Sequence, residues 1–207
     1  MKLYSAHRAP NPRRVLMFIA EKAVPGIEVV NVDLAQGQHF EEGFRVISPF
    51  SRVPALELDD GRVLTESRAI CSWLEGRFPE PNLMGVDADE RAFVESADRE
   101  LEFHLLLPLA MWIRHCHPGL AALEKPQFPD YGRAQAERAR QAAQAFDERL
   151  ARQAWMAGER FTIADITAFC ALEFARGLMK FRLDEAGLAH LAAWRERVAS
   201  RPSAAAV

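Results

Sequence analysis

The chain has 207 residues, of which 49% are hydrophobic and 27% are charged, and this balance excludes an intrinsically disordered chain. Its 26 basic and 29 acidic side chains leave a net charge of −3, so no overall basic field attracts nucleic acid or an anionic membrane. The N-terminus carries no apolar stretch long enough for a signal peptide, and no segment approaches a membrane span. We therefore expect a cytoplasmic protein with neither nucleic acid nor membrane as a partner.

Residues 1–79 predict an α/β domain with a small mixed sheet, because helical and strand-like apolar patterns alternate along them. The turn sequence Asp59-Asp60-Gly61 lies between two apolar runs and predicts a β-hairpin. In chain order we expect a strand at 1–5, a helix from 12 to about 25, a strand at 27–33, an irregular helix before 48, strands at 53–58 and 62–64, and a helix at 66–78.

Residues 87–207 predict an all-helical domain, joined to the first by a linker at 79–82. No alternating strand pattern occurs there, and alanine, leucine, arginine and glutamate dominate the long stretches. Thr162 and Asp165 have the form of a capping box ahead of an apolar helix. The last residues, Ser203–Val207, are expected to fray.

The three cysteines are odd in number, widely spaced and set among apolar neighbours in segments that resemble helices. They are Cys71, Cys116 and Cys170. Such a set suits buried thiols in a reducing compartment better than a disulfide framework. His115 and His117 flank one cysteine, but no further ligands cluster there and this spacing points their rings apart on a helix. We expect no metal.

Two spaced motifs stand out in the first domain. The first reads SPFSRVPAL from Ser48 to Leu56, and the second reads LTESRAI from Leu64 to Ile70. Together with Asn11–Val15, Gly37–His39 and the closing Arg201–Ser203, they resemble the glutathione S-transferase superfamily over nearly the whole chain. The resemblance is to bacterial theta- or nu-like or fungal-like cytosolic members. It implies a thioredoxin-like N-terminal domain and an all-α C-terminal helical bundle.

Val53 and Pro54 suit the binding of an extended peptide. An X-Pro bond adopts the cis form at a cost of only ~0.5–1 kcal/mol. A cis bond here would turn the amide and carbonyl of Val53 outward, where a peptide such as glutathione can pair with them.

Glu66 and Ser67 lie where a loop becomes a helix. Free backbone amides, the helix dipole and the Ser67 hydroxyl can hold the γ-glutamyl carboxylate of glutathione, and Glu66 can take the ammonium group. The alternative is that Thr65–Ser67 only cap the helix.

His39 and Arg52 resemble the positions that meet the glycyl carboxylate in theta-like members. Cationic or hydrogen-bond-donating side chains suit that task. For His39 on its own, a plain surface residue is the alternative.

The resemblance implies chemistry by the thiolate of glutathione, which needs donors aimed at the sulfur because a free thiol has a pKa near ~8.5. The serine that supplies a donor in theta-like and zeta-like relatives is replaced by Ala9. Asn11 resembles the asparagine of nu-like members and is our catalytic candidate, with Tyr4 and Ser5 as fallbacks. No cysteine lies in this loop, which argues against omega-like and beta-like redox chemistry.

The resemblance places the pocket for a hydrophobic second substrate between the domains, near Met111, Trp112 and His115. His115 or His117 can orient a water near the sulfur. The alternative is a helix-end histidine that interacts with terminal carbonyls or solvent.

The implied function is a glutathione S-transferase that conjugates reduced glutathione to hydrophobic electrophiles, with peroxidase activity as a side reaction. Glutathione is a co-substrate and no other cofactor is expected, while a homodimer is expected from the resemblance. The rivals are a glutathione-dependent isomerase of the maleylacetoacetate type and a noncatalytic ligand-binding or protein-interaction module. Ala9 supports the noncatalytic rival, and the glutathione-site motifs oppose it.

Overall fold

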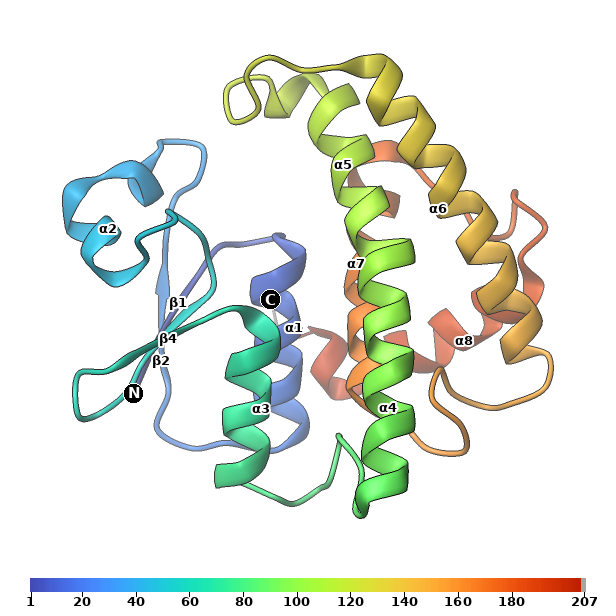
Figure 1. Ribbon diagram of the computed structural model, residues 1–207, viewed down its shortest axis with the longest axis horizontal. Helices are drawn as coiled ribbons and strands as arrows, with labels where there is room; N and C mark the ends of the chain where they lie inside the picture. Colours follow the sequence, from blue (N-terminus) through green and yellow to red (C-terminus); the bar gives the residue numbers. More distant parts are fainter. Residues whose placement is uncertain (206–207) are drawn as a thin grey trace. The chain divides into compact units, whose positions relative to one another are not determined.

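The computed structural model describes residues 1–205 and divides the chain into two units (Figure 1). Within the described residues, one unit comprises Met1–Asn82 together with Pro202–Ala205, and the other comprises Leu83–Arg201. Each unit buries an apolar core of its own.

The first unit is built on a four-stranded mixed sheet in the order β2-β1-β3-β4. Strand β1 (Lys2–Ser5) pairs in parallel with β2 (Glu28–Asn31) and antiparallel with β3 (Ala55–Glu57), and β3 pairs antiparallel with β4 (Val63–Thr65). The parallel pair is joined by a helix, as such a crossover requires, and the antiparallel pair by the predicted short turn. Leu3 and Leu56 are opposite each other in the register and fully buried.

Helices α1 (Pro10–Glu21) and α3 (Ser67–Arg77) lie side by side on one face of this sheet (Figure 1). Their buried apolar residues, including Phe18 and Ile70, form the core against the strands. The 3-10 turn η1 (Gln38–Phe40) and the short helix α2 (Glu42–Ile47) follow β2. The predicted order of strand, helix, strand, irregular helix, hairpin and helix is confirmed, with α1 beginning two residues before its predicted start.

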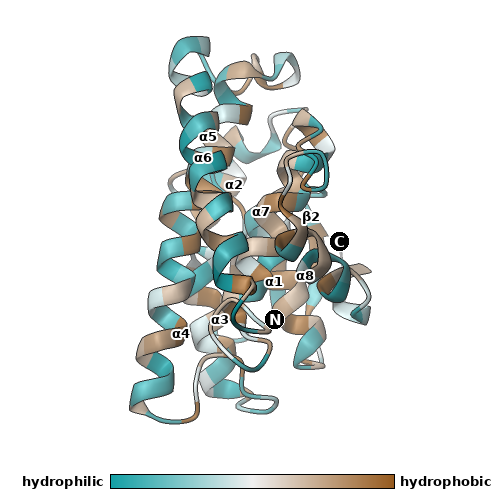
Figure 2. Cartoon of the chain, turned by 90° about the vertical axis from the view of Figure 1, so that its right-hand side faces the viewer, coloured by the Kyte–Doolittle hydropathy of each residue, from teal (hydrophilic) through white to brown (hydrophobic). Residues whose placement is uncertain are grey.

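The second unit is all-helical within the described residues, as predicted. Helix α7 (Ile163–Met179) is its centre, because its first ten residues are all buried. The surrounding helices show alternating hydrophilic and hydrophobic bands, as expected for helices with one face in the core (Figure 2). They are α4 (Ala88–Leu101), α5 (Leu107–Cys116), the turn η3 (Pro118–Leu120), α6 (Pro129–Leu150) and α8 (Ala189–Ala199).

Helices α4 and α5 are continuous through η2 (Glu102–Leu106), one turn of π-helix. Pro108 stands just beyond this turn and has no N–H to donate to the carbonyl four residues earlier, so the regular hydrogen-bond register is interrupted there.

Helix α7 begins at the predicted capping box. Thr162 and Asp165 make both reciprocal interactions of the box, and Asp165 is fully buried. Burial of this cap makes it part of the core of the second unit as well as of the helix end.

The C-terminal residues differ from the sequence prediction. Residues Pro202–Ala205 form a further turn, η4, that belongs to the first unit, where Ser203 and Ala204 are buried. The Arg13 guanidinium donates to the Ala204 carbonyl at 2.9 Å. The expectation of a frayed end in the helical domain is therefore wrong up to Ala205, and residues 206–207 lie outside the described part.

Cys71 and Cys170 are buried, whereas Cys116 is partly exposed at the end of α5, against expectation; all three are thiols that are not joined by a disulfide. No helix within residues 1–205 is long and apolar enough to cross a membrane.

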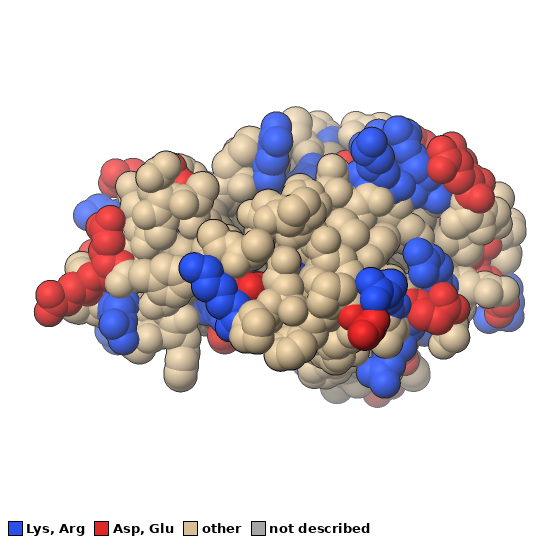
Figure 3. Space-filling model, turned by 90° about the horizontal axis from the view of Figure 1, so that it is seen from above, with Lys and Arg blue, Asp and Glu red and all other residues tan. Residues whose placement is uncertain are grey.

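On the face shown in Figure 3, basic and acidic side chains lie near one another on a larger uncharged surface.

Candidate functional site

The loop before β3 presents backbone groups that the sheet does not use. The Val53-Pro54 peptide bond is cis. Ladder pairing of β3 begins only at Ala55, so the N–H and C=O of Val53 take no part in the sheet. The Ser48 hydroxyl closes the loop, because it donates to the Arg52 carbonyl at 2.8 Å and accepts from the Arg52 N–H at 3.0 Å. This leaves the Arg52 side chain exposed.

The start of α3 is a second place where several hydrogen-bond donors lie together. Glu66 precedes it with φ of +66° and is exposed, and no side chain caps the helix. A non-glycine residue at such a φ costs ~1–3 kcal/mol and is typical of ligand sites. Ser67, the first helical residue, is 5% exposed. The absence of a side-chain cap counts against the alternative in which these residues only cap the helix, since the first-turn amides stay available for an anion.

His39 is 5% exposed, which rules out the alternative of a plain surface histidine. It lies in the turn η1, which begins after Gly37 at φ of +75°. Its ring packs on that of Phe40, with centroids 3.8 Å apart.

Few hydrogen-bond donors at the N-terminus of α1 are available to a ligand, and they belong to Asn11. Ala9 occupies the cap position without a side-chain hydrogen bond. Pro10 and Pro12 have no N–H, and the Arg13 N–H already donates to the Ala9 carbonyl at 3.1 Å. The backbone N–H and the exposed side-chain amide of Asn11 therefore remain, at the positive end of the helix dipole.

Tyr4 is committed elsewhere. Its hydroxyl donates to the Glu57 carboxylate at 2.7 Å across the β1–β3 pair. This hydrogen bond, with burial and the nearby Glu57 charge, raises the pKa of Tyr4 to about 12. Ser5, the other fallback, is buried.

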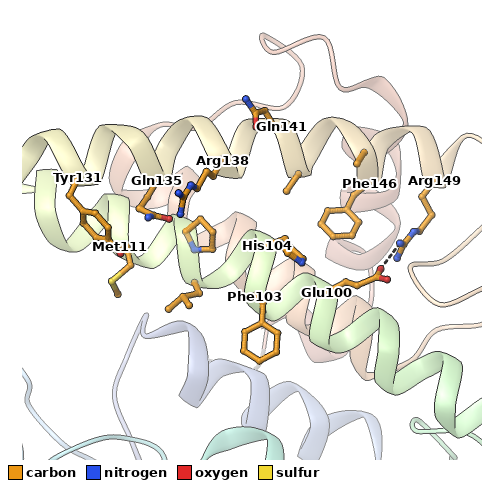
Figure 4. A pocket seen from close by; sticks show the side chains of 14 residues that line it. Glu100, Phe103, His104, Met111, Tyr131, Gln135, Arg138, Gln141, Phe146 and Arg149 are labelled. Atoms are coloured by element: carbon orange, nitrogen blue, oxygen red, sulfur yellow. Dashed lines mark hydrogen bonds and ion pairs between the residues drawn. The ribbon is translucent and has the colours of Figure 1, made fainter.

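The structure gives Met111, Trp112 and His115 of α5 different surroundings within the second unit. Met111 lines a groove against α6 (Figure 4). Trp112 packs edge-on against Phe181, and His115 is buried with its Nδ1 accepting from the Phe128 N–H at 3.2 Å. The neutral His115 ring would therefore carry its proton on Nε2. Their joint role in a second-substrate pocket stays a prediction.

The groove itself has a volume of about 780 Å³ and lies between the α4–η2–α5 helix and α6 (Figure 4). The Glu100–Arg149 ion pair marks one end. Its other lining residues include Phe103, Leu107, Met111, Tyr131, Gln135 and Arg138.

Arg14 is a residue of this region that the sequence did not single out. It lies on the inner face of α1, 1% exposed, and its Nη1 donates to the Ser67 hydroxyl oxygen at 3.2 Å. The one available signal was a charged residue at an apolar position of the helical stripe, because arginine is seldom fully buried.

Comparison with known proteins identifies the architecture as that of glutathione transferases. The family description "Glutathione S-transferase, N-terminal domain" matches residues 9–77, and "Glutathione S-transferase, C-terminal domain" matches residues 111–202. Glutathione S-transferase 2 of Saccharomyces cerevisiae is 32% identical over 205 residues, covering 98% of this chain and 87% of that protein. The chain therefore belongs to the glutathione S-transferase family, whose enzymes use glutathione as co-substrate.

A solved structure from Marinobacter aquaeolei VT8, a glutathione S-transferase domain-containing protein, matches with a TM-score of 0.88 and 38% identity, covering 98% of this chain and 99% of that one. A maleylacetoacetate isomerase of Pseudomonas aeruginosa is 37% identical over 93 residues, which is 44% of each chain.

Proposed function

We propose that this protein conjugates reduced glutathione to hydrophobic electrophiles. The observation that carries the proposal is the buried Ser67 at the uncapped N-terminus of α3, in the same unit as the unused backbone groups of Val53. A peptide that carries a free carboxylate matches this combination of an extended backbone partner and an anion site.

Glutathione would be held along its length by groups of the first unit. The N–H and C=O of Val53 would pair with the cysteinyl backbone, beside Pro54. Ser67 and the α3 amides would take the γ-glutamyl carboxylate and Glu66 its ammonium group. His39 and Arg52 would meet the glycyl carboxylate.

Asn11 would polarise the sulfur. The reacting species is the thiolate, which forms when the thiol gives its proton to water. Its sulfur then bonds to the electrophilic carbon, either as a leaving group departs with its electron pair or as an activated double bond opens and takes up a proton. Lowering the thiol pKa by about two units corresponds to ~2.7 kcal/mol of preference for the thiolate. Two donors on Asn11 and the positive end of α1 supply interactions of this kind.

The electrophile pocket would involve Met111, Trp112 and His115 of the helical unit. Two apolar side chains and one polar ring suit a hydrophobic electrophile. In a side reaction, organic hydroperoxides would be reduced to the alcohol and water while two glutathione molecules are oxidised to the disulfide. The reaction needs no cofactor besides glutathione as co-substrate. Three cysteines without a disulfide suit a cytoplasmic, reducing location.

We also propose a homodimer. Its support is the groove of the helical unit, whose wall exposes Phe103, Leu107 and Tyr131. Exposed apolar side chains gathered at one site are typical of surfaces that a second chain covers.

A glutathione-dependent isomerase is the second candidate, favoured by the match to the Pseudomonas isomerase over less than half of each chain. A noncatalytic module is the third, favoured by the missing hydroxyl at Ala9. The isomerase would turn over a cis-unsaturated diketo acid without consuming glutathione, whereas the noncatalytic module would bind glutathione without lowering the pKa of its thiol.

The test is calorimetric binding of reduced glutathione with an ultraviolet titration of the bound thiol. We expect binding, a bound-thiol pKa well below ~8.5, and weaker binding by Ser67→Ala. No binding at millimolar glutathione would overturn the proposed function, and binding without a lowered pKa would favour the noncatalytic module.

A further inference from the structure

Arg14 is a charged side chain in a buried position. It lies on the inner face of α1, next to the buried Val15, and is 1% exposed. Removing a guanidinium from water is strongly unfavourable unless other groups use its charge and its donors. The structure shows one such use, since its Nη1 donates to the hydroxyl oxygen of Ser67 at 3.2 Å.

This contact sets the direction of the Ser67 hydroxyl. A guanidinium can only donate, so the Ser67 oxygen must accept in this bond, and its own hydrogen remains for another acceptor. No hydrogen-bond acceptor for that hydrogen occurs among the described residues. The Ser67 hydroxyl can therefore donate this hydrogen to a bound ligand.

The positive charge of Arg14 adds to the positive potential at the N-terminus of α3. Ser67 is the first residue of α3, where the free amides and the helix dipole already create a positive potential. An anion bound at Ser67 would be attracted by both the cation of Arg14 and the positive end of α3, and a neutral group would not.

We propose that Arg14 is a positioning residue for glutathione that orients Ser67 from within the core and selects a carboxylate at the γ-glutamyl end. The inference rests on the proposed function, because it assumes that glutathione binds with this carboxylate at Ser67. It adds a residue that does not itself touch the ligand and acts through Ser67.

The test compares two ligands and five proteins. The ligands are glutathione and γ-aminobutyryl-cysteinylglycine, which lacks only the carboxylate in question. The proteins are wild type, Ser67→Ala, Arg14→Gln, the double variant with both changes, and Arg13→Gln. Arg13→Gln is the matched control, since the neighbouring arginine donates to the Ala204 carbonyl instead of Ser67. Thermal unfolding of each variant reports on folding.

We expect Arg14→Gln to weaken glutathione binding about tenfold or more, as for a hydrogen bond to a charged group. The KM for glutathione should rise while kcat at saturation and the pKa of the bound thiol stay as in wild type. The analogue should bind wild type and Arg14→Gln alike. Arg14→Gln added to Ser67→Ala should cost less than it does in wild type.

Unchanged glutathione affinity in a folded Arg14→Gln variant, or an equal loss of affinity for both ligands, would overturn the inference. Weaker glutathione binding by Ser67→Ala in the same experiment would still support the proposed function. Failure of wild type to bind glutathione would overturn both. If Arg14→Gln does not fold, Arg14→Lys replaces it, with a larger loss expected for glutathione than for the analogue and equal losses contradicting the inference.

Discussion

At the scale of single residues, Asn11 and Tyr4 differ in whether their hydrogen-bond donors are available to the sulfur of glutathione. Asn11 has a backbone N–H and a side-chain amide at the start of α1, whereas the Tyr4 hydroxyl is held by Glu57. A phenol whose pKa is raised to about 12 keeps its proton and donates it to that carboxylate, so it has no hydrogen left to donate to a thiolate.

We predict that Asn11→Ala raises the pKa of the bound glutathione thiol by about one unit, the scale of one hydrogen bond to a charged group. The value of kcat/KM at neutral pH should fall about tenfold with it. Tyr4→Phe, the control, should change neither quantity. An unchanged thiol pKa in Asn11→Ala would show that another group activates the sulfur.

At the scale of elements, Asp165 joins the start of α7 to two other parts of the helical unit. Its carboxylate accepts from the Met156 N–H at 2.9 Å, the Trp194 indole N–H at 2.8 Å and the Thr162 N–H at 3.0 Å. We predict that Asp165→Asn lowers the free energy of unfolding by about 2–3 kcal/mol, because an amide nitrogen cannot accept and leaves a buried donor unpaired. Denaturant titration measures this, and Asp130→Asn in the exposed first turn of α6 is the near-neutral control.

The same carboxyl predicts a pH dependence. Burial raises the pKa of Asp165 from 3.8 to about 6, against the hydrogen bonds it accepts. The folded protein thus binds a proton below about pH 6 that the unfolded chain binds only near pH 3.8. This contribution to stability is present at low pH and is lost as the pH rises through about 6. The stability of wild type relative to Asp165→Asn should therefore increase between pH 6 and pH 4, by up to ~3 kcal/mol; a constant difference would contradict it.

At the scale of the whole molecule, the groove of the helical unit is where a second chain would bind. Leu107 is 48% exposed on its wall. We predict that Leu107→Glu weakens dimerisation at least tenfold, because a buried unpaired carboxylate is strongly unfavourable. Sedimentation equilibrium at micromolar concentrations measures this. Val86→Glu, exposed in the same unit but outside the groove, should leave the dimer intact. A monomeric wild type, or a Leu107→Glu dimer as tight as wild type, would contradict the proposed interface.

Local patterns were sufficient for the order of elements and for most of the candidate glutathione site. Strand and helix periodicity, the Asp59-Asp60-Gly61 turn and the Thr162–Asp165 box all depend on residues close together in the chain. The motifs around Val53-Pro54 and Glu66-Ser67 are local in the same sense, so the sequence by itself determined the family and the residues proposed to meet glutathione.

Only the tertiary structure decided which distant groups meet. Arg14 reaches Ser67 over 53 positions of sequence, and Tyr4 reaches Glu57 over the same separation. Residues 202–205 join the first unit rather than the helical one. Periodicity tells which face of a helix or strand is apolar, but the partner of a side chain on that face depends on how the elements pack, because contacts between distant segments leave no local pattern.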